Sequence, residues 1–388
     1  MQMTAVFLMD TAFPYGQAFS SRARYFTKLL CQCGYHVHVI APKQQKEQYC
    51  PELDGVACTI EYIQVSNSKL TMAGIGTAKP YISVLEAYLA SNKVDVVFSA
   101  SMPFVAGKIR AVTKKHGIPY VIEQCEWFDV STFTGGKWNP LYRKHIRRIE
   151  KENKNCDGVL SISRLFHEHY TGQGANSIRI PTILDVQNTH SRTEYTGDQI
   201  NIVFAGSLGK GKENIAPILE AISLLGEDAQ KLHFNIYGAN NAQVLENVRG
   251  NQTLMDKVAP YVTAHGRIPQ QEVEGKFRDA DYSIFIRPDR RSSHAGFPTK
   301  LAESMAVGTP VISNNTGDIG LYLKDGETGF LLQTGTAEEL AEAFRKMLAM
   351  DAQQRRQQRK NTRAMAEQSF DYRVYAEQMQ CFLNGIMK

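Results

Sequence analysis

Along the first half of the chain, short apolar runs alternate with longer segments whose apolar residues recur at helical spacing. The segment 17–34 shows the helical pattern, with Phe26, Leu29 and Leu30 on one face. The predicted strands are 4–9, 36–41, 58–65, 94–99, 119–123, 158–162 and 178–183, and the predicted helices are 17–34, 81–92, 107–116 and 141–155. Because helices separate short buried strands, the pattern predicts an α/β fold with a parallel, doubly wound sheet.

The alternation stops at residues 190–199, a polar segment without apolar periodicity, and then starts again. In the second half, the predicted strands are 200–204, 233–237, 262–265, 282–286 and 310–313, and the predicted helices are 214–225, 270–278, 299–307, one beginning at Thr336, and 372–383. We therefore expect a Rossmann-like domain over 1–189, a linker over 190–199, a second such domain over 200–368 and a terminal helical segment over 369–388.

Composition agrees with a soluble globular protein, since 43% of the residues are apolar and 21% are charged. A chain of 388 residues is too long for one ordinary core and fits two domains. No run of 18 or more apolar residues occurs, and the start, which carries Asp10 and no basic stretch, is typical of a first strand rather than a signal peptide. We therefore expect a cytoplasmic protein.

Cysteine spacing and charge exclude several classes of site. Seven cysteines occur without a C-x-x-C pair, which predicts reduced, mostly buried thiols and no zinc site. The chain has no G-x-G-x-x-G run, so a nicotinamide cofactor is not expected. The net charge of +5 permits an anionic partner but does not require nucleic acid.

A loop of turn-forming residues in the second half runs directly into a predicted helix. Gly296 and Pro298 precede the helix 299–307. Such a loop directs backbone N–H groups and the positive end of the helix dipole at one point, which suits a phosphate group. Lys300 adds a cation, and Glu303 lies one turn later on about the same face. The diphosphate and sugar of a nucleotide-sugar would use all of these groups.

A second glycine-rich loop, residues 205–212, follows the first predicted strand of the second half. Gly206 allows the backbone to approach a ligand, and Lys210 and Lys212 supply positive charge for a diphosphate. The alternative interpretation is a tight turn exposed to solvent.

The run GFPTKLAESMAVGTPVI, residues 296–312, resembles the donor-binding segment of the retaining glycosyltransferases of the GT-B fold, family four. The resemblance covers nearly the whole chain and is strongest over residues 200–332. It implies two Rossmann-like domains facing a cleft, with a terminal helix that crosses back onto the first domain. It also implies a nucleotide-sugar donor as co-substrate, with no cofactor and no metal.

The same resemblance assigns roles in the second domain. Glu303 takes the ribose role, and Lys212 takes a catalytic role beside the diphosphate. The residues assigned to the sugar-diphosphate are Gly206, Ser207, Gly296, Phe297, Pro298, Thr299 and Lys300. Two of the family's contacts are changed, because Ala295 replaces a glutamate that contacts the donor sugar and Ser207 replaces an arginine. His294 is one candidate to supply the lost sugar contact.

Other loops at predicted strand ends complete the expected site. The resemblance also implies that the backbone of Arg267 and Ile268 contacts the nucleobase, and Arg287 is a candidate for the missing arginine contact. In the first domain, Gly16 lies in a loop expected to approach the donor phosphates or the acceptor. Glu126 follows a central strand and is the candidate catalytic carboxylate. Its alternative role is capping or salt bridging.

The segment 137–151 mixes aromatic and basic residues. Tyr142, Ile146 and Ile149 form one stripe, with arginines and lysines on the other side. This pattern is typical of a helix lying on an anionic membrane, which would place the chain at the inner face of the cell membrane. A helix packed against its own domain remains the alternative.

The expected reaction transfers a sugar from a UDP- or GDP-sugar to a hydroxyl of a glycan or lipid-linked oligosaccharide, with retention of configuration, in cell-surface polysaccharide synthesis. Lys212, Lys300 and the loop amides would stabilise the leaving diphosphate. Two alternatives remain open. One is a hydrolase or epimerase acting on a nucleotide-sugar without an acceptor. The other is a non-catalytic nucleotide-sugar-binding protein.

Overall fold

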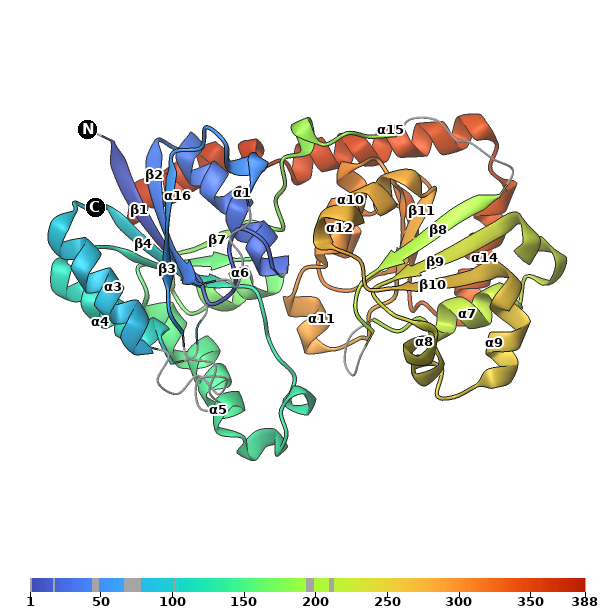
Figure 1. Cartoon of the computed structure of the whole chain (residues 1–388), viewed down its shortest axis with the longest axis horizontal. Helices are drawn as coiled ribbons and strands as arrows, with labels where there is room; N and C mark the ends of the chain where they lie inside the picture. The colour runs from blue at the N-terminus through green and yellow to red at the C-terminus, as the bar shows by residue number, and fades with distance from the viewer. Residues whose placement is uncertain are drawn as a thin grey trace. The chain divides into compact units, whose positions relative to one another are not determined.

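The computed structural model describes residues 2–16, 18–43, 49–65, 78–100, 102, 104–192, 199–208 and 213–387. The chain forms two compact units, one of Met1–Ile183 with Tyr372–Lys388 and one of Leu184–Asp371. Each unit is a parallel sheet covered by helices (Figure 1). The expectation of two doubly wound α/β domains is therefore confirmed.

The first unit has a seven-stranded sheet in the order β3-β2-β1-β4-β5-β6-β7. Its strands are β1 (Met3–Leu8), β2 (Tyr35–Pro42), β3 (Cys58–Ile63), β4 (Val96–Ala100), β5 (Tyr120–Gln124), β6 (Gly158–Ser161) and β7 (Ser177–Arg179). Its helices are α1 (Ala18–Gln32), α3 (Ala78–Ser91), α4 (Ala106–His116), α5 (Pro140–Arg147), α6 (Arg164–Thr171) and α16 (Ala376–Ile386). The strand order reverses beside β1, which is the topology expected of a doubly wound sheet.

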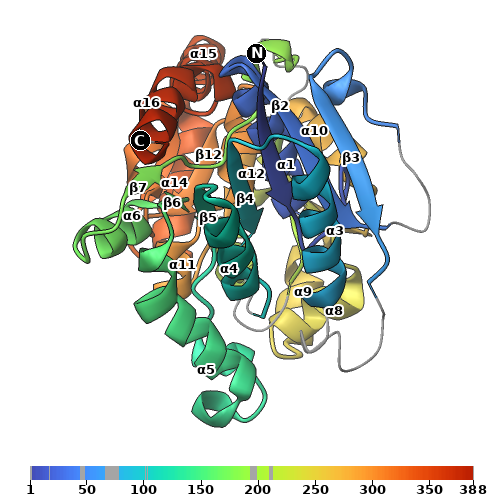
Figure 2. The ribbon, with the colours of Figure 1, turned by 90° about the vertical axis from the view of Figure 1, so that its left-hand side faces the viewer.

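The C-terminal segment belongs to the core of the first unit. Met379 and Leu383 of α16 are 0% and 1% exposed and lie in one apolar cluster with residues of β1, β2 and α1. Figure 2 views this unit from the side on which α3, α4 and α5 lie. The terminal helix thus packs on the first unit although it follows the second in the chain.

The second unit has a six-stranded parallel sheet in the order β10-β9-β8-β11-β12-β13. Its strands are β8 (Ile200–Ala205), β9 (Leu232–Tyr237), β10 (Val262–Gly266), β11 (Tyr282–Phe285), β12 (Val311–Asn314) and β13 (Gly329–Leu332). Its helices are α7 (Ala216–Ser223), α8 (Asn241–Asn247), α9 (Gln252–Val258), α10 (Gln270–Asp279), α11 (Arg291–Ala295), α12 (Thr299–Ala306), α13 (Ile319–Tyr322), α14 (Ala337–Ala349) and α15 (Ala352–Ser369). Loops at the carboxyl ends of these strands carry most of the predicted site.

The second unit takes up the chain at Leu184, before the predicted linker. The Leu184 N–H donates to the Phe370 carbonyl at 2.7 Å, and Arg363 donates to the carbonyls of Val186 and Thr189 at 2.6 and 2.8 Å. Residues 184–189 therefore pack with the second unit. Residues 193–198 of the predicted linker lie outside the described residues.

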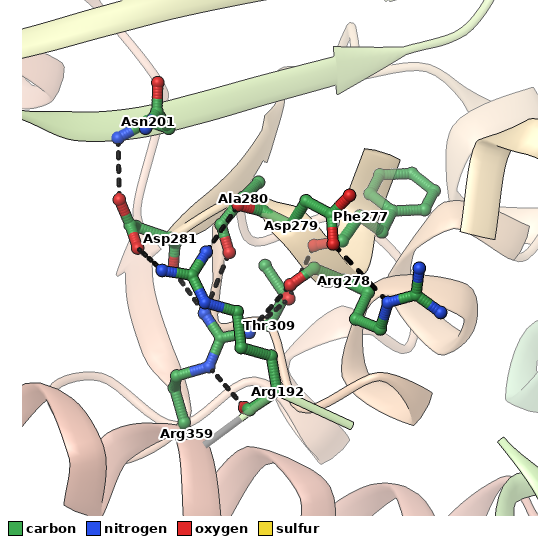
Figure 3. Close-up of polar contacts among 9 residues, drawn as sticks. All are labelled: Arg192, Asn201, Phe277, Arg278, Asp279, Ala280, Asp281, Thr309 and Arg359. Atoms are coloured by element: carbon green, nitrogen blue, oxygen red, sulfur yellow. Dashed lines mark hydrogen bonds and ion pairs between the residues drawn. The ribbon is translucent and has the colours of Figure 1, made fainter. Parts of the chain in front are cut away.

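Helix α15 was not predicted, because the side chains that it buries are polar. Arg359 and Thr362 are 2% and 0% exposed. Arg359 donates to the carbonyls of Ala280 and Arg192 at 2.8 and 3.0 Å, and to the Thr309 hydroxyl at 3.1 Å (Figure 3). Since a buried guanidinium needs many acceptors, these bonds fix α15 against the chain segments around β11.

The segment predicted as a helix over 141–155 is helical throughout, but its helix type changes. After α5 come a π-helical turn (Arg148–Glu152) and a 3-10 turn (Asn153–Asn155). Of the expected stripe, Ile149 is 0% exposed, while Tyr142 and Ile146 are half-buried. The expectation that the basic side chains are solvated was wrong for Arg148, because His145 and Arg148 are 5% and 1% exposed and fill buried positions. The His145 ring, for example, accepts the Phe128 N–H at 3.0 Å.

All seven cysteines are free thiols, as expected, although two of them, Cys33 and Cys50, are buried and most of the others are half-buried. Within the described ranges, no helix has the length and apolar character needed to cross a membrane.

We predict that Arg359→Met lowers the free energy of unfolding by about 3 kcal/mol, because buried carbonyls lose a charged donor. Arg356→Met is the matched control, since Arg356 is exposed on the same helix and its loss should cost less than about 0.5 kcal/mol. Urea denaturation of both variants measures the difference. Equal midpoints would show that the Arg359 bonds do not hold the second unit together.

Candidate functional site

The loops after β8, β9 and β10 meet through glycines. The Gly206 N–H donates to the Tyr237 carbonyl at 2.9 Å, and the Gly238 N–H donates to the Gly266 carbonyl at 2.7 Å. Gly238 has a φ of +100°, and a Cβ built on it would lie 2.3 Å from the Gly206 carbonyl oxygen. No other residue type fits there without displacing backbone, so a close approach of two strand ends creates this surface.

Lys300, the predicted cation, lies directly against Gly206. A Cβ on Gly206 would come within 2.7 Å of the Lys300 Nζ. The same Nζ lies 4.7 Å from the ring centroid of Phe204 and 2.9 Å from the Glu213 Oε1. The structure thus brings together Gly206 and Lys300, which are nearly one hundred positions apart in the sequence. Both residues were expected to bind the same diphosphate.

Glu213 is a site residue that sequence reasoning missed. Its side chain is 18% exposed. Burial acts to raise the pKa of this carboxyl, but the charge and hydrogen bond of Lys300, a backbone hydrogen bond and the charge of Arg287 together outweigh burial, and the pKa lies below its ordinary value. Glu213 is therefore ionised at neutral pH and holds Lys300 in place. No local sequence signal marks this role, because it arises from a contact with Lys300, which is distant in the sequence.

The predicted anion-binding loop has the expected form. After α11, Pro298 is extended and α12 begins at Thr299, with the Leu301 N–H donating to the Pro298 carbonyl at 3.0 Å. The helix ends at Ala306, and Gly308, whose φ is +76°, follows the C-cap residue Val307. The positive end of an eight-residue helix therefore starts beside Lys300.

Two polar anchors fix the loop before α12. The Arg287 guanidinium donates to the Ser293 carbonyl at 2.7 Å. The His294 Nδ1 accepts the Gly317 N–H at 3.0 Å, and its Nε2 lies 2.5 Å from the Asp289 Oδ1. Both ring nitrogens of His294 are thus engaged within the protein. Arg287 braces the loop through Ser293, a role that the sequence did not suggest.

Phe297 does not present its side chain as a ligand group. It is 7% exposed, and its ring packs edge-on against the rings of Tyr322 and Phe370 at centroid distances of 5.7 and 5.8 Å. Its expected part in diphosphate binding therefore falls to its backbone.

Ala295, which replaces the family's glutamate that contacts the donor sugar, is 0% exposed.

The other predicted donor residues lie around this core. Glu303 is half-buried on α12, one turn beyond Lys300. Ser207 and Arg267 are exposed, and Ile268 is half-buried after β10. Near them the rings of Tyr237 and His265 stack at 4.4 Å. Lys212 lies outside the described residues.

Two predicted site residues belong to the first unit. Gly16 is exposed, and a Cβ on it would lie 2.9 Å from the Ser20 Oγ. Glu126 is exposed after β5, and its carbonyl accepts the Gln124 side-chain N–H at 2.7 Å. The next residue, Trp127, is 4% exposed and stacks on Phe166 at 5.5 Å. The buried tryptophan anchors the loop that carries the Glu126 carboxylate. Across the described part of the chain, no three His, Cys, Asp or Glu side chains converge as a metal site would require.

Each of the two units is a parallel α/β sheet, and a loop with the form of a phosphate-binding loop lies at the strand ends of the second unit. Residues 199–350 match the family model of glycosyl transferases group 1. Over these residues the chain is similar to the group 1 glycosyltransferases, which confirms the resemblance drawn from the sequence.

Individual relatives are distant. The chain is 26% identical over 326 residues to an uncharacterized 41.2 kDa protein in the cps region of Klebsiella pneumoniae, covering 79% of this chain and 80% of that protein. It is 24% identical over 180 residues to the putative colanic acid biosynthesis glycosyltransferase WcaL of Escherichia coli, covering 45% of this chain and 43% of that protein. The fold matches Anabaena HepE, solved with UDP-glucose, with a TM-score of 0.69, 13% identity and coverage of 98% of this chain and 99% of that chain.

We predict that Gly238→Ala destabilises the second unit well beyond the cost of the left-handed conformation, because its Cβ would clash with the Gly206 backbone. Gly226→Ala is the matched control. Gly226 has a φ of +60° with no atom within 4 Å of the added Cβ, so its substitution should cost about 1 kcal/mol. Thermal denaturation compares the two variants. A Gly238→Ala protein as stable as Gly226→Ala would contradict the proposed close contact.

Proposed function

We propose that the chain is a retaining glycosyltransferase that moves a sugar from a UDP- or GDP-sugar to a hydroxyl of a glycan or lipid-linked oligosaccharide. The observation that carries the proposal is the convergence of Lys300, the Gly206 turn and the first turn of α12 on one surface. Support also comes from the family of residues 199–350 and from HepE, a protein of similar fold solved with UDP-glucose. The colanic acid relative supports a place in polysaccharide biosynthesis.

In the proposed reaction, the bond from the sugar C1 to the diphosphate breaks while a bond from the acceptor oxygen to C1 forms on the same face of the sugar. The acceptor proton passes to the leaving diphosphate. Negative charge grows on the β-phosphate, and the α12 dipole, Lys300 and loop amides stabilise it. Lys212 is proposed to add a further cation. These groups provide the charge stabilisation for which other enzymes use a metal ion, so we propose that none is required.

In the proposed reaction, the Lys300 ammonium group pairs first with Glu213 and then with the diphosphate of the donor. Without donor, Lys300 pairs with the ionised Glu213 at 2.9 Å. A diphosphate carries more charge than one carboxylate and competes for the same ammonium group. The pair thus holds the cation in place before the donor arrives, which lowers the cost of ordering its side chain.

We assign acceptor binding to the first unit, with Glu126 as the candidate carboxylate that contacts the acceptor hydroxyl. The carboxylate is exposed, while its backbone is fixed through Gln124 and the buried Trp127. An exposed carboxylate on an anchored backbone can accept a hydrogen bond from a sugar hydroxyl.

We further propose a peripheral contact of the first unit with the anionic inner face of the cell membrane. Trp138 is 85% exposed, and the nearby cations Lys137, Arg143 and Arg147 are also exposed. An exposed indole beside several cations suits the interface of an anionic bilayer. The contact should weaken as salt is raised, because it depends on screened surface charges.

We predict that Glu303→Ala weakens binding of the free nucleoside diphosphate by about 1.5–3 kcal/mol, since a ribose hydrogen bond to a charged group is lost. Titration calorimetry with the wild-type protein and the variant measures this. Glu342→Ala, at an exposed carboxylate of α14, is the control and should leave the affinity unchanged. An affinity of Glu303→Ala equal to that of the control would remove the ribose assignment.

The function itself is tested with a panel of UDP-, GDP- and ADP-sugars. The matching donor should raise the melting temperature, because it binds the folded state. Slow hydrolysis that accelerates sharply with an acceptor, and a product of retained anomeric configuration, would support the transferase. Turnover that no acceptor accelerates would instead indicate a hydrolase or epimerase, and binding without any turnover would indicate a non-catalytic binding protein.

A further inference from the structure

A separate hollow of about 210 Å³ lies in the first unit, between α4 and the turns that follow α5. Figure 2 shows α4 and α5 on the side of the unit toward the viewer. The polar residues that matter for its chemistry are Arg110, Tyr120, Lys144, Arg148, Glu152 and Asn155. None of them belongs to the proposed donor site.

The charge of this pocket is unbalanced. Three cations, Arg110, Lys144 and Arg148, line it together with a single carboxylate, that of Glu152. Glu152 is already engaged, because Lys144 donates to it at 3.1 Å and Arg147 pairs with it at 2.9 Å. The lining residues therefore carry a surplus of two positive charges, and the carboxyl of Asp10, which is not part of the lining, also acts on Arg148.

The two guanidinium groups act on the same wall of the pocket. Burial raises the pKa of the Cys156 thiol to about 12, and the charges of Arg110 and Arg148 both act in the opposite direction. Arg148 is 1% exposed, so water solvates its charge poorly and an anion in the pocket would interact with it strongly. Burial lowers the pKa of Arg148 for the same reason.

The first turn of α4 leaves open space in the pocket and directs the positive end of the helix dipole toward it. Gly107 lines it in the first turn of α4, and no atom lies within 4 Å of a Cβ built there. The first turn of an 11-residue helix adds positive potential to the cationic side chains.

We propose that this pocket binds a phosphomonoester group. Such a group carries about −1.5 to −2 charge at neutral pH, which matches the surplus of the pocket better than a single carboxylate does. Arginine donors suit phosphate oxygens because the planar guanidinium makes two parallel hydrogen bonds. The group can belong to a soluble sugar monophosphate or to a lipid headgroup. The inference goes beyond the proposed transferase function and does not depend on it.

The test is titration calorimetry of the full chain with inorganic phosphate and with glucose 6-phosphate. Lys300→Gln serves as the background throughout, so that phosphate binding at the donor site is reduced. Within it, Arg110→Gln should weaken binding at least about tenfold, the effect expected for one charged hydrogen bond. Lys114→Gln is the matched control, because it removes one exposed positive charge from the same helix outside the pocket, and it should change the affinity less than about twofold.

A second variant tests the cavity rather than the charge. Gly107→Leu places a side chain in the space beside Gly107 and should abolish binding, while circular dichroism verifies that the fold is retained. Vesicles containing phosphatidic acid, compared with phosphatidylcholine alone, show whether the group is also taken from a lipid. The proposal fails if neither soluble phosphate binds, if Gly107→Leu binds as well as its background, or if Lys114→Gln weakens binding as much as Arg110→Gln.

Discussion

The contact between the Gly206 and Gly238 backbones is the constraint on which the donor surface depends. Because a Cβ at Gly238 would lie 2.3 Å from the Gly206 carbonyl oxygen, the ends of β8 and β9 approach each other as backbone alone. The same turn leaves space for the Lys300 ammonium group. This junction and the pair with Glu213 hold the Lys300 ammonium group in place, which lowers the cost of ordering that side chain when a ligand binds.

Several arginine side chains are buried in this protein, and their hydrogen bonds connect distant parts of the chain. Arg359 satisfies its guanidinium with backbone carbonyls and Thr309, while Arg22 of α1 pairs with Glu123 and donates to the Ile180 carbonyl at 2.9 Å. Each of these two arginines bonds to chain segments that are distant in the sequence. Arg148 is also buried, and together with Arg110 and Lys144 it lines the hollow for which we propose a phosphate ligand.

The residue pattern predicted the sheets, most strands and the helix α12, because these elements bury apolar side chains with regular spacing. It failed where buried side chains are polar. Helix α15 buries Arg359 and Thr362 and so lacks the apolar stripe that identifies a packed helix. The segment 141–155 was predicted as a helix, but its pattern did not indicate that Arg148 is buried. Gly206 and Lys300 could be predicted from loop chemistry. Glu213 could not, since its role arises from a contact between residues distant in sequence, and the burial of Phe297 likewise depends on Phe370.

An experimental structure of the full chain with a nucleoside diphosphate bound would show whether the second unit holds the nucleotide at the Gly206 turn. We expect the diphosphate between this turn and the first turn of α12, with the Lys300 Nζ moved from Glu213 to a phosphate oxygen and the ribose beside Glu303. A nucleotide bound elsewhere, with the Lys300–Glu213 pair intact, would contradict this assignment of the donor site.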